Sequence, residues 1–78
     1  METHEVKALL EAHLSGCEIH VEGGGSSFQV TAVGDVFEGL NAVKRQQCVY
    51  AALNEQIADG SIHAVTIKTF TPAQWAER

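Results

Sequence analysis

The side chains that could carry chemistry are four histidines, two cysteines and the carboxylates of a 78-residue chain. A nucleophilic site needs a serine or cysteine held beside a base, and a zinc site needs several donors at short spacing. The cysteines, Cys17 and Cys48, stand in unrelated contexts and form no CxxC motif, and no Ser-His-Asp arrangement can be assembled. The glycine run 23–25 lies between two predicted strands, so it lacks the helix N-terminus that a phosphate-binding loop uses. The pattern predicts a protein that binds a partner rather than one that catalyses a reaction.

The four histidines differ in what their positions allow. His4 and His13 fall on a predicted first helix, where a solvated side chain is the simplest interpretation. His20 alternates with Ile19 and is expected on the open face of a sheet. His63 follows a Gly-Ser turn at the first residue of a predicted strand, where its imidazole can reach a loop edge instead of the core. From the residues alone a structural role is the simpler interpretation of His63, and ligand binding is the alternative.

The cysteines and the start of the chain indicate a reducing compartment. The acidic N-terminus leads directly into an amphipathic pattern and does not resemble a signal peptide, and no apolar run approaches the roughly 18 residues of a membrane span. We therefore expect a cytoplasmic protein with free thiols and no membrane partner. Cys48 is expected to act as a small, partly buried hydrophobe in a helix, and Cys17 to be structural at the start of a strand.

The charge balance bears on nucleic-acid binding. The formal net charge is −5, with only five lysines and arginines, whereas nucleic-acid-binding domains usually carry a basic excess. Lys44, Arg45 and Lys68 are the only candidates for a basic patch, and exposure of the first two at a helix start is the simpler interpretation. DNA is therefore not expected to be the main partner.

Hydrophobic periodicity and turn residues predict the elements that position these side chains. They are a helix over 3–14, strands over 18–22 and 28–33, a short helical turn over 35–38, a helix over 41–58, a strand over 63–69 and a helix from 71. A right-handed crossover through the long helix makes the second and third strands parallel neighbours, with the second strand central. The predicted fold is one α+β domain over 1–78, a three-stranded mixed sheet with helices packed on one face.

Residue patterns also predict how the helices begin and which face they bury. Thr3 is expected to cap the first helix, and the D-x-x-E pattern from Asp35 predicts a capping box. Thr71-Pro72-Ala73-Gln74 predicts a capping box at the last helix, in which Trp75 is expected to pack against the body of the domain. In the long helix, one buried stripe is expected from the residues Val49, Leu53 and Ile57.

Two stretches of the chain resemble the motifs of the BolA family. The first is VGDVFEGL at 33–40 with VKRQQCVY at 43–50, and the second is IHAVTIKTFTPAQW at 62–75. The resemblance covers essentially the whole chain, and the Lys-Arg-Gln-Gln run is most similar to the bacterial IbaG branch. It implies a class II KH-like (BolA-like) fold, in agreement with the order of elements predicted above.

The resemblance also implies a partner, a monothiol glutaredoxin that holds a [2Fe–2S] cluster with glutathione. The histidine of the I-H-A motif, here His63, is then the expected cluster ligand, and Rieske centres show that imidazole can ligate such a cluster. A second histidine or cysteine usually comes from the loop between the first two strands, but residues 23–27 contain neither, and Ser27 stands where relatives carry histidine. Cys17 and His20 flank this loop and are the remaining candidates for a second metal ligand.

Three functions are consistent with these features. The first, implied by the resemblance, is a non-catalytic adaptor in iron–sulfur cluster trafficking or assembly and in the stress response, with no intrinsic cofactor. The alternative is a DNA-binding transcriptional regulator of the BolA type, although the GXXG loop that KH domains use is missing and we expect only weak DNA binding. The third is a protein–protein module in which His63 only orders a turn. Alone, the chain is expected to be a monomer or a weak homodimer.

Overall fold

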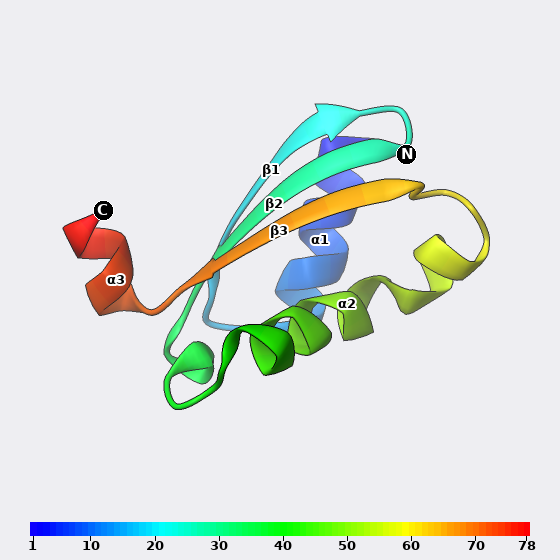
Figure 1. Ribbon diagram of the computed structural model, residues 1–78. Coiled ribbons are helices and arrows are strands. Elements are labelled where there is room, and N and C mark those ends of the chain that lie inside the picture. Colours follow the sequence, from blue (N-terminus) through cyan, green and yellow to red (C-terminus); the bar gives the residue numbers. More distant parts are fainter.

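A computed structural model describes all residues from Met1 to Arg78 as a sheet with two helices on one face (Figure 1). In chain order the elements are α1 (Thr3–His13), β1 (Glu18–Gly24), β2 (Ser27–Val33), the 3-10 turn η1 (Asp35–Phe37), α2 (Ala42–Ala58), β3 (Ala64–Phe70) and α3 (Pro72–Glu77). This order is the one that the sequence predicts. None of the helices has the length and apolarity needed to cross a membrane.

The sheet has the strand order β1-β2-β3, so β2 is central. β1 pairs with β2 in antiparallel orientation and β2 pairs with β3 in parallel orientation. Parallel neighbours need a crossover connection, which α2 supplies. α1 and α2 pack on one face of the sheet, and α3 lies beyond the end of β3 (Figure 1). The predicted α+β architecture with a mixed, three-stranded sheet is confirmed.

The core lies between the sheet and the two long helices. Strand alternation directs every second side chain of β1 and β2 to the helices, where burial of each large apolar group contributes roughly 1.5–3 kcal/mol. The buried cluster consists of Val6, Leu10, Leu14, Ile19, Phe28, Val30, Ala32, Phe37, Val49, Leu53 and Ile62. β3 adds only the half-buried Val65 and Ile67. The core is therefore centred under β1 and β2, and β3 contributes few buried side chains to it.

The helix starts agree only partly with the sequence predictions. At α3 the predicted capping box is confirmed: the Gln74 amide donates to Thr71 Oγ1 at 3.2 Å, and the Thr71 amide donates to Gln74 Oε1 at 2.9 Å. The predicted cap at Thr3 is wrong, because Thr3 is already helical and Glu2 is the N-cap residue, whose amide donates to Glu5 Oε1 at 2.9 Å. The predicted box at Asp35 is also wrong, since Asp35 is the first residue of η1 and Glu38 already lies past its end.

Two further predictions differ slightly from the structure, one for the buried face of α2 and one for the first residue of β3. Val49 and Leu53 are fully buried, but Ile57 is 37% exposed. Each step of four residues turns about 40° around a helix, so Ile57 has rotated away from the core. β3 begins at Ala64, one residue after the predicted start at His63, and the amides of both residues donate to the same carbonyl in the β1–β2 turn.

Candidate functional site

His63 lies in the connection between α2 and β3, at the end of the sheet that also holds the β1–β2 turn. Its amide donates to the Ser26 carbonyl oxygen at 2.7 Å, and the Ala64 amide donates to the same oxygen at 3.1 Å. The preceding Ile62 is buried, and its amide donates to the Gln56 carbonyl oxygen at 3.1 Å. The backbone on both sides of His63 is thereby fixed, whereas the imidazole is exposed.

The β1–β2 turn beside His63 is built from glycine and serine. Gly23 has φ of +116°, and an added Cβ would collide with the Ser27 carbonyl oxygen, so only glycine fits this position. Ser27 pairs with Ala64 in the register of β2 and β3, which puts the turn next to the start of β3. The turn offers carbonyl and hydroxyl oxygens next to the backbone of His63, but neither a second imidazole nor a thiol.

The turn that precedes His63 is ordered by Asp59. The Asp59 carboxylate accepts a hydrogen bond from the Ser61 amide at 2.8 Å. Hydrogen bonds from the Ser61 side chain, and then from its backbone, hold the pKa of Asp59 below its ordinary value. This carboxylate is therefore ionised at neutral pH and occupied within its own turn.

The two other candidate ligands lie away from His63: His20 is farther along β1, and Cys17 is just before its start. A strand rises about 3.3 Å per residue, so His20 is roughly 13 Å from Gly24 at the turn, and Cys17 is roughly 23 Å from it. The fold does not bring either side chain beside His63. A site that combines Cys17 or His20 with His63 is therefore not assembled within one chain, and a ligand role for these residues stays a prediction.

Cys17 is held in a packed environment. Its thiol is half-buried, and its Sγ lies where a side chain on Gly34 would project. Burial, and secondarily the negative charge of Asp35, raise the pKa of the Cys17 thiol. Both effects disfavour the thiolate, which is the form that binds metal. Cys48 is half-buried in α2, as its position in the sequence predicts.

The metal-binding side chains of this chain do not gather at one place. No group of three or more histidine, cysteine, aspartate or glutamate side chains could hold a metal ion. A [2Fe–2S] cluster has four ligand positions, which thiolates or imidazoles fill. Among the residues of the β1–β2 turn and of the connection from α2 to β3, His63 is the one side chain of either type.

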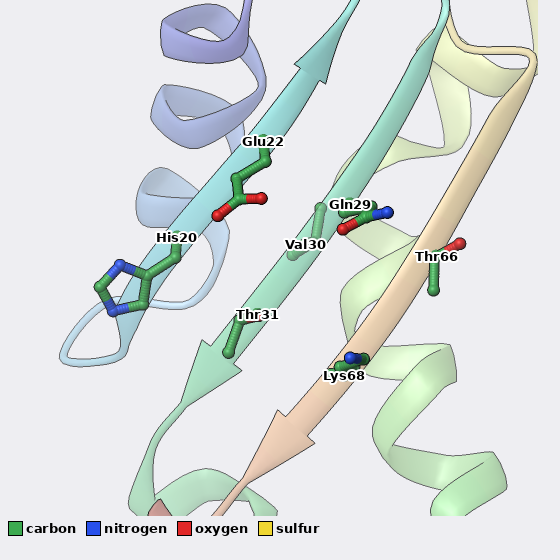
Figure 2. Close-up of a pocket in the computed structure, with 7 residues that line it drawn as sticks. All are labelled: His20, Glu22, Gln29, Val30, Thr31, Thr66 and Lys68. Atoms are coloured by element: carbon green, nitrogen blue, oxygen red, sulfur yellow. The ribbon is translucent and has the colours of Figure 1, made fainter.

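The open face of the sheet carries polar side chains in rows that cross all three strands. The rows are His20–Thr31–Lys68 and Glu22–Gln29–Thr66. They line a shallow hollow of about 300 Å³ (Figure 2). The predicted placement of His20 on this face is confirmed.

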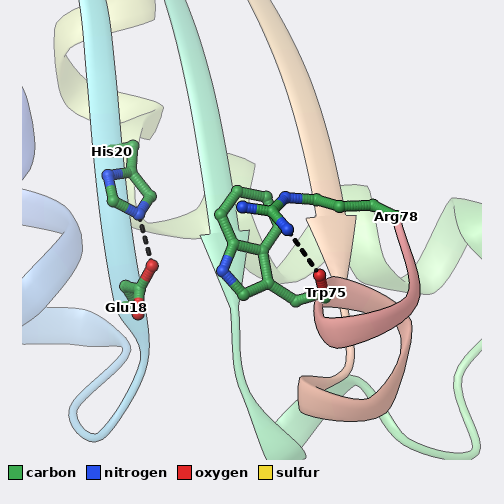
Figure 3. A network of polar contacts seen from close by, with 4 residues as sticks. All are labelled: Glu18, His20, Trp75 and Arg78. Carbon is green, nitrogen blue, oxygen red and sulfur yellow. Dashed lines mark hydrogen bonds and ion pairs between the residues drawn. The ribbon is translucent and has the colours of Figure 1, made fainter.

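α3 folds back over one end of this open face, which the sequence does not reveal (Figure 3). The rings of His20 and Trp75 are stacked with centroids 5.7 Å apart, and Arg78 lies 3.6 Å from the Trp75 centroid. His20 Nε2 also lies 2.5 Å from Glu18 Oε2. His20 is therefore engaged in contacts that hold α3, and the predicted packing of Trp75 on the body of the domain is confirmed.

The three candidate nucleic-acid-binding residues do not form one patch. Lys44 is exposed in the first turn of α2, whereas Lys68 is on the open face of the sheet, opposite the helices. Arg45 is half-buried and donates to the Leu40 carbonyl oxygen at 3.0 Å and to Gln74 Oε1 at 2.9 Å. Its guanidinium joins α2 to α3 through two of its five N–H donors.

Comparison with known proteins agrees with the motifs and the fold. The model of the BolA-like protein family matches residues 2–74. The chain is 55% identical over 76 residues to the acid stress protein IbaG of Escherichia coli K12, covering 97% of this chain and 90% of that protein. A bolA protein homologue from Coxiella burnetii superposes with a TM-score of 0.85 at 35% identity, covering 100% of this chain and 99% of the other. BolA1 from Arabidopsis thaliana gives 0.80 at 30% identity, covering 92% and 93%.

The sequence motifs, the strand order and these similarities lead to one assignment. The resemblance to the IbaG branch is supported by identity over nearly the whole length of the chain. The chain belongs to the BolA family.

Proposed function

We propose that the protein is a non-catalytic cytoplasmic adaptor that binds a monothiol glutaredoxin and shares a [2Fe–2S] cluster with it in iron–sulfur cluster trafficking. The observation that carries the proposal is the exposed imidazole of His63 on a fixed backbone. A nitrogen donor held in this way needs little reorganisation to meet a ligand arriving from outside.

The cluster would be shared because neither molecule alone provides this combination of ligands. This chain contributes His63, and the glutaredoxin with its bound glutathione contributes thiolates. Exchange of a thiolate for an imidazole raises the reduction potential of a [2Fe–2S] cluster and changes its spectra. Binding of the adaptor would therefore alter the chemistry of the cluster that the glutaredoxin carries.

The name of the Escherichia coli relative suggests the condition under which this adaptor acts. That relative is an acid stress protein, and we extend a role in acid stress to this chain. Metal ligands bind in their deprotonated form, so the affinity of a histidine-ligated cluster depends on pH. Cluster sharing is expected to weaken on acidification.

The test is reconstitution with a monothiol glutaredoxin and glutathione under anaerobic conditions, followed by visible absorption and circular dichroism. The wild-type chain should give a mixed-cluster spectrum, and His63→Ala should abolish it without changing thermal unfolding, because the imidazole is exposed. His13→Ala removes another exposed imidazole, and Cys48→Ser a thiol, so both should retain the spectrum. If His63→Ala keeps the wild-type spectrum and cluster lifetime, the ligand assignment is wrong.

A second variant tests the loop without removing a donor. Ser27→His adds an imidazole at the turn beside His63. If one ligand from this chain limits cluster lifetime, the variant should hold the mixed cluster longer than the wild type does. An unchanged or shorter lifetime would contradict that explanation.

The DNA-binding alternative has less support because its three basic residues are dispersed. With about three phosphate contacts, the logarithm of affinity should fall with the logarithm of salt concentration with a slope near −3, without base discrimination. Sequence-selective binding at nanomolar concentration in physiological salt would favour the regulator over the adaptor.

A further inference from the structure

β3 is an edge strand with little protection against pairing. It is the last strand of the sheet, and it contains no proline and a single charged residue, Lys68. Edge strands of natural proteins are usually blunted by prolines, bulges, several charges or a covering segment. The outer side of β3 is therefore competent to pair with another strand.

The hydrogen bonds to β2 identify which backbone groups of β3 face outward. The Ala64 amide donates to Ser26, and the Phe70 carbonyl accepts from Gly34, so the even-numbered residues direct their backbone groups to β2. The odd-numbered residues direct theirs to the outer edge. These outward residues are Val65, Ile67 and Thr69, and no hydrogen bond outside the helices and strands involves them.

The flank of α2 below this edge carries an apolar stripe, which consists of Val43, Tyr50 and Ile57. The three are seven residues apart, so they lie along one line of the helix. They are 65%, 36% and 37% exposed. The other flank, which includes Ala51, faces α1 and η1 across an apolar groove, so the stripe lies on the β3 side of α2 (Figure 1).

We propose that the β3 edge and the apolar stripe bind a second copy of this chain, with the two β3 strands antiparallel across a two-fold axis. Ile67 is the middle residue of β3, and Tyr50 is the middle residue of both α2 and the stripe. α2 runs antiparallel to β3, because Arg45 near its start bonds Gln74 just past the end of β3. Tyr50 and Ile67 are therefore at the same level, and one axis can pass through both.

One two-fold axis allows both the backbone hydrogen bonds between the β3 strands and the packing of the apolar stripes. It pairs Ile67 with Ile67 of the second copy and Val65 with Thr69, so that every outward amide and carbonyl finds a partner. On α2 it places Val43 beside Ile57 of the second copy. The result is a continuous six-stranded sheet with the two α2 helices side by side beneath it.

The charges also favour a second copy as the occupant. The chain has ten carboxylates and a net charge of −5, yet none of the carboxylates is in β3 or the stripe. Lys68 lies opposite Thr66 of the second copy rather than opposite itself. Two copies of an acidic molecule can therefore meet here without bringing carboxylates of β3 or the stripe together.

The size of the surface sets the expected affinity. The seven residues of β3 extend about 23 Å, and the molecule is 19 Å across in its shorter dimensions. The surface therefore covers roughly 440 Å² per copy, against about 800 Å² per partner in a stable complex. A weak dimer that forms between about 10 μM and 1 mM is expected.

Amide hydrogen exchange by NMR, measured across this concentration range, tests the pairing directly. Protection of the Val65, Ile67 and Thr69 amides should increase severalfold with concentration, while the Thr66 and Lys68 amides, already bonded to β2, should not change. Equal exchange at all concentrations, with a monomeric mass by sedimentation equilibrium, would overturn the proposal. So would protection that appears only when an extended peptide from another protein is added.

Charged variants at the axis test the symmetry. Tyr50→Glu and Tyr50→Lys should each be monomeric at 1 mM, because like charges meet at the axis, and an equimolar mixture should dimerise again. Ala51→Glu introduces the same charge on the other flank of α2 and should dimerise like the wild type. A Tyr50→Glu variant that still dimerises, or a mixture no more associated than its components, would overturn the two-fold arrangement.

Discussion

Gly34 lies against the thiol of Cys17, and an alanine at this position should destabilise the fold. Gly34 is buried and has an extended backbone with φ of −173°, so alanine would meet no backbone strain. Its Cβ, however, would overlap the Cys17 Sγ and lie 3.3 Å from the Cys17 Cβ. Overpacking of this kind costs about 1–3 kcal/mol. A loss of about 2 kcal/mol would lower the Tm by roughly 10 °C in a domain of this size.

Urea denaturation followed by far-ultraviolet circular dichroism measures this loss. The double variant Cys17→Ala/Gly34→Ala removes the Sγ and should recover about 1 kcal/mol or more relative to the sum of the single changes. Gly24→Ala is the matched control, because that glycine has no positive φ and nothing within 4 Å of an added Cβ. If Gly34→Ala is as stable as Gly24→Ala, or if the double variant is additive, the packing argument is refuted.

Three further predictions concern individual contacts. Thr71→Ala should remove the capping box of α3, cost about 1 kcal/mol, and expose Trp75, seen as a red shift of its fluorescence; an unshifted spectrum would contradict this. Ser61→Ala removes the hydroxyl but keeps the backbone amide, so it should raise the pKa of Asp59 part of the way toward its ordinary value in a carboxyl NMR titration, and an unchanged pKa would exclude the Ser61 hydroxyl as a cause. Because the pKa of Asp59 is depressed, its stabilising effect is present above the ordinary carboxyl range and lost as pH falls through the folded-state value. Cys17 should be alkylated more slowly in the folded chain than in urea, since burial raises the pKa of its thiol, and equal rates would show that the thiol is accessible.

Local sequence patterns predict the helices and strands because alternation and capping depend on residues that are close together in the chain. Alternation in 28–33 reflects the pleat of β2, and the Thr71–Gln74 pair makes the same capping box in the structure as in the sequence motif. The handedness of crossovers then leaves one arrangement for β2 and β3. The errors at Thr3 and Asp35 have an equally local cause, because each helix begins one residue earlier than predicted, with Glu2 and Gly34 as the N-cap residues.

The candidate site could be predicted only in part because distances across a sheet depend on register. His63 is adjacent to the β1–β2 turn, as a strand-start position allows. The separation of Cys17 from this turn depends on β1 continuing to Gly24, which pairs with Ser27 although glycine gives no strand signal. The stacking of Trp75 on β1 likewise joins residues distant in the sequence.

Pulsed EPR of the reduced mixed cluster asks directly whether His63 ligates a cluster shared with a glutaredoxin. The chain is labelled with ¹⁵N-histidine, and the glutaredoxin and glutathione are left unlabelled. A ¹⁵N coupling of the size expected for a directly coordinated imidazole should appear in the wild type and in His20→Ala, and should be lost in His63→Ala. A mixed cluster without ¹⁵N coupling in the wild type, or with the coupling retained in His63→Ala, would contradict the account.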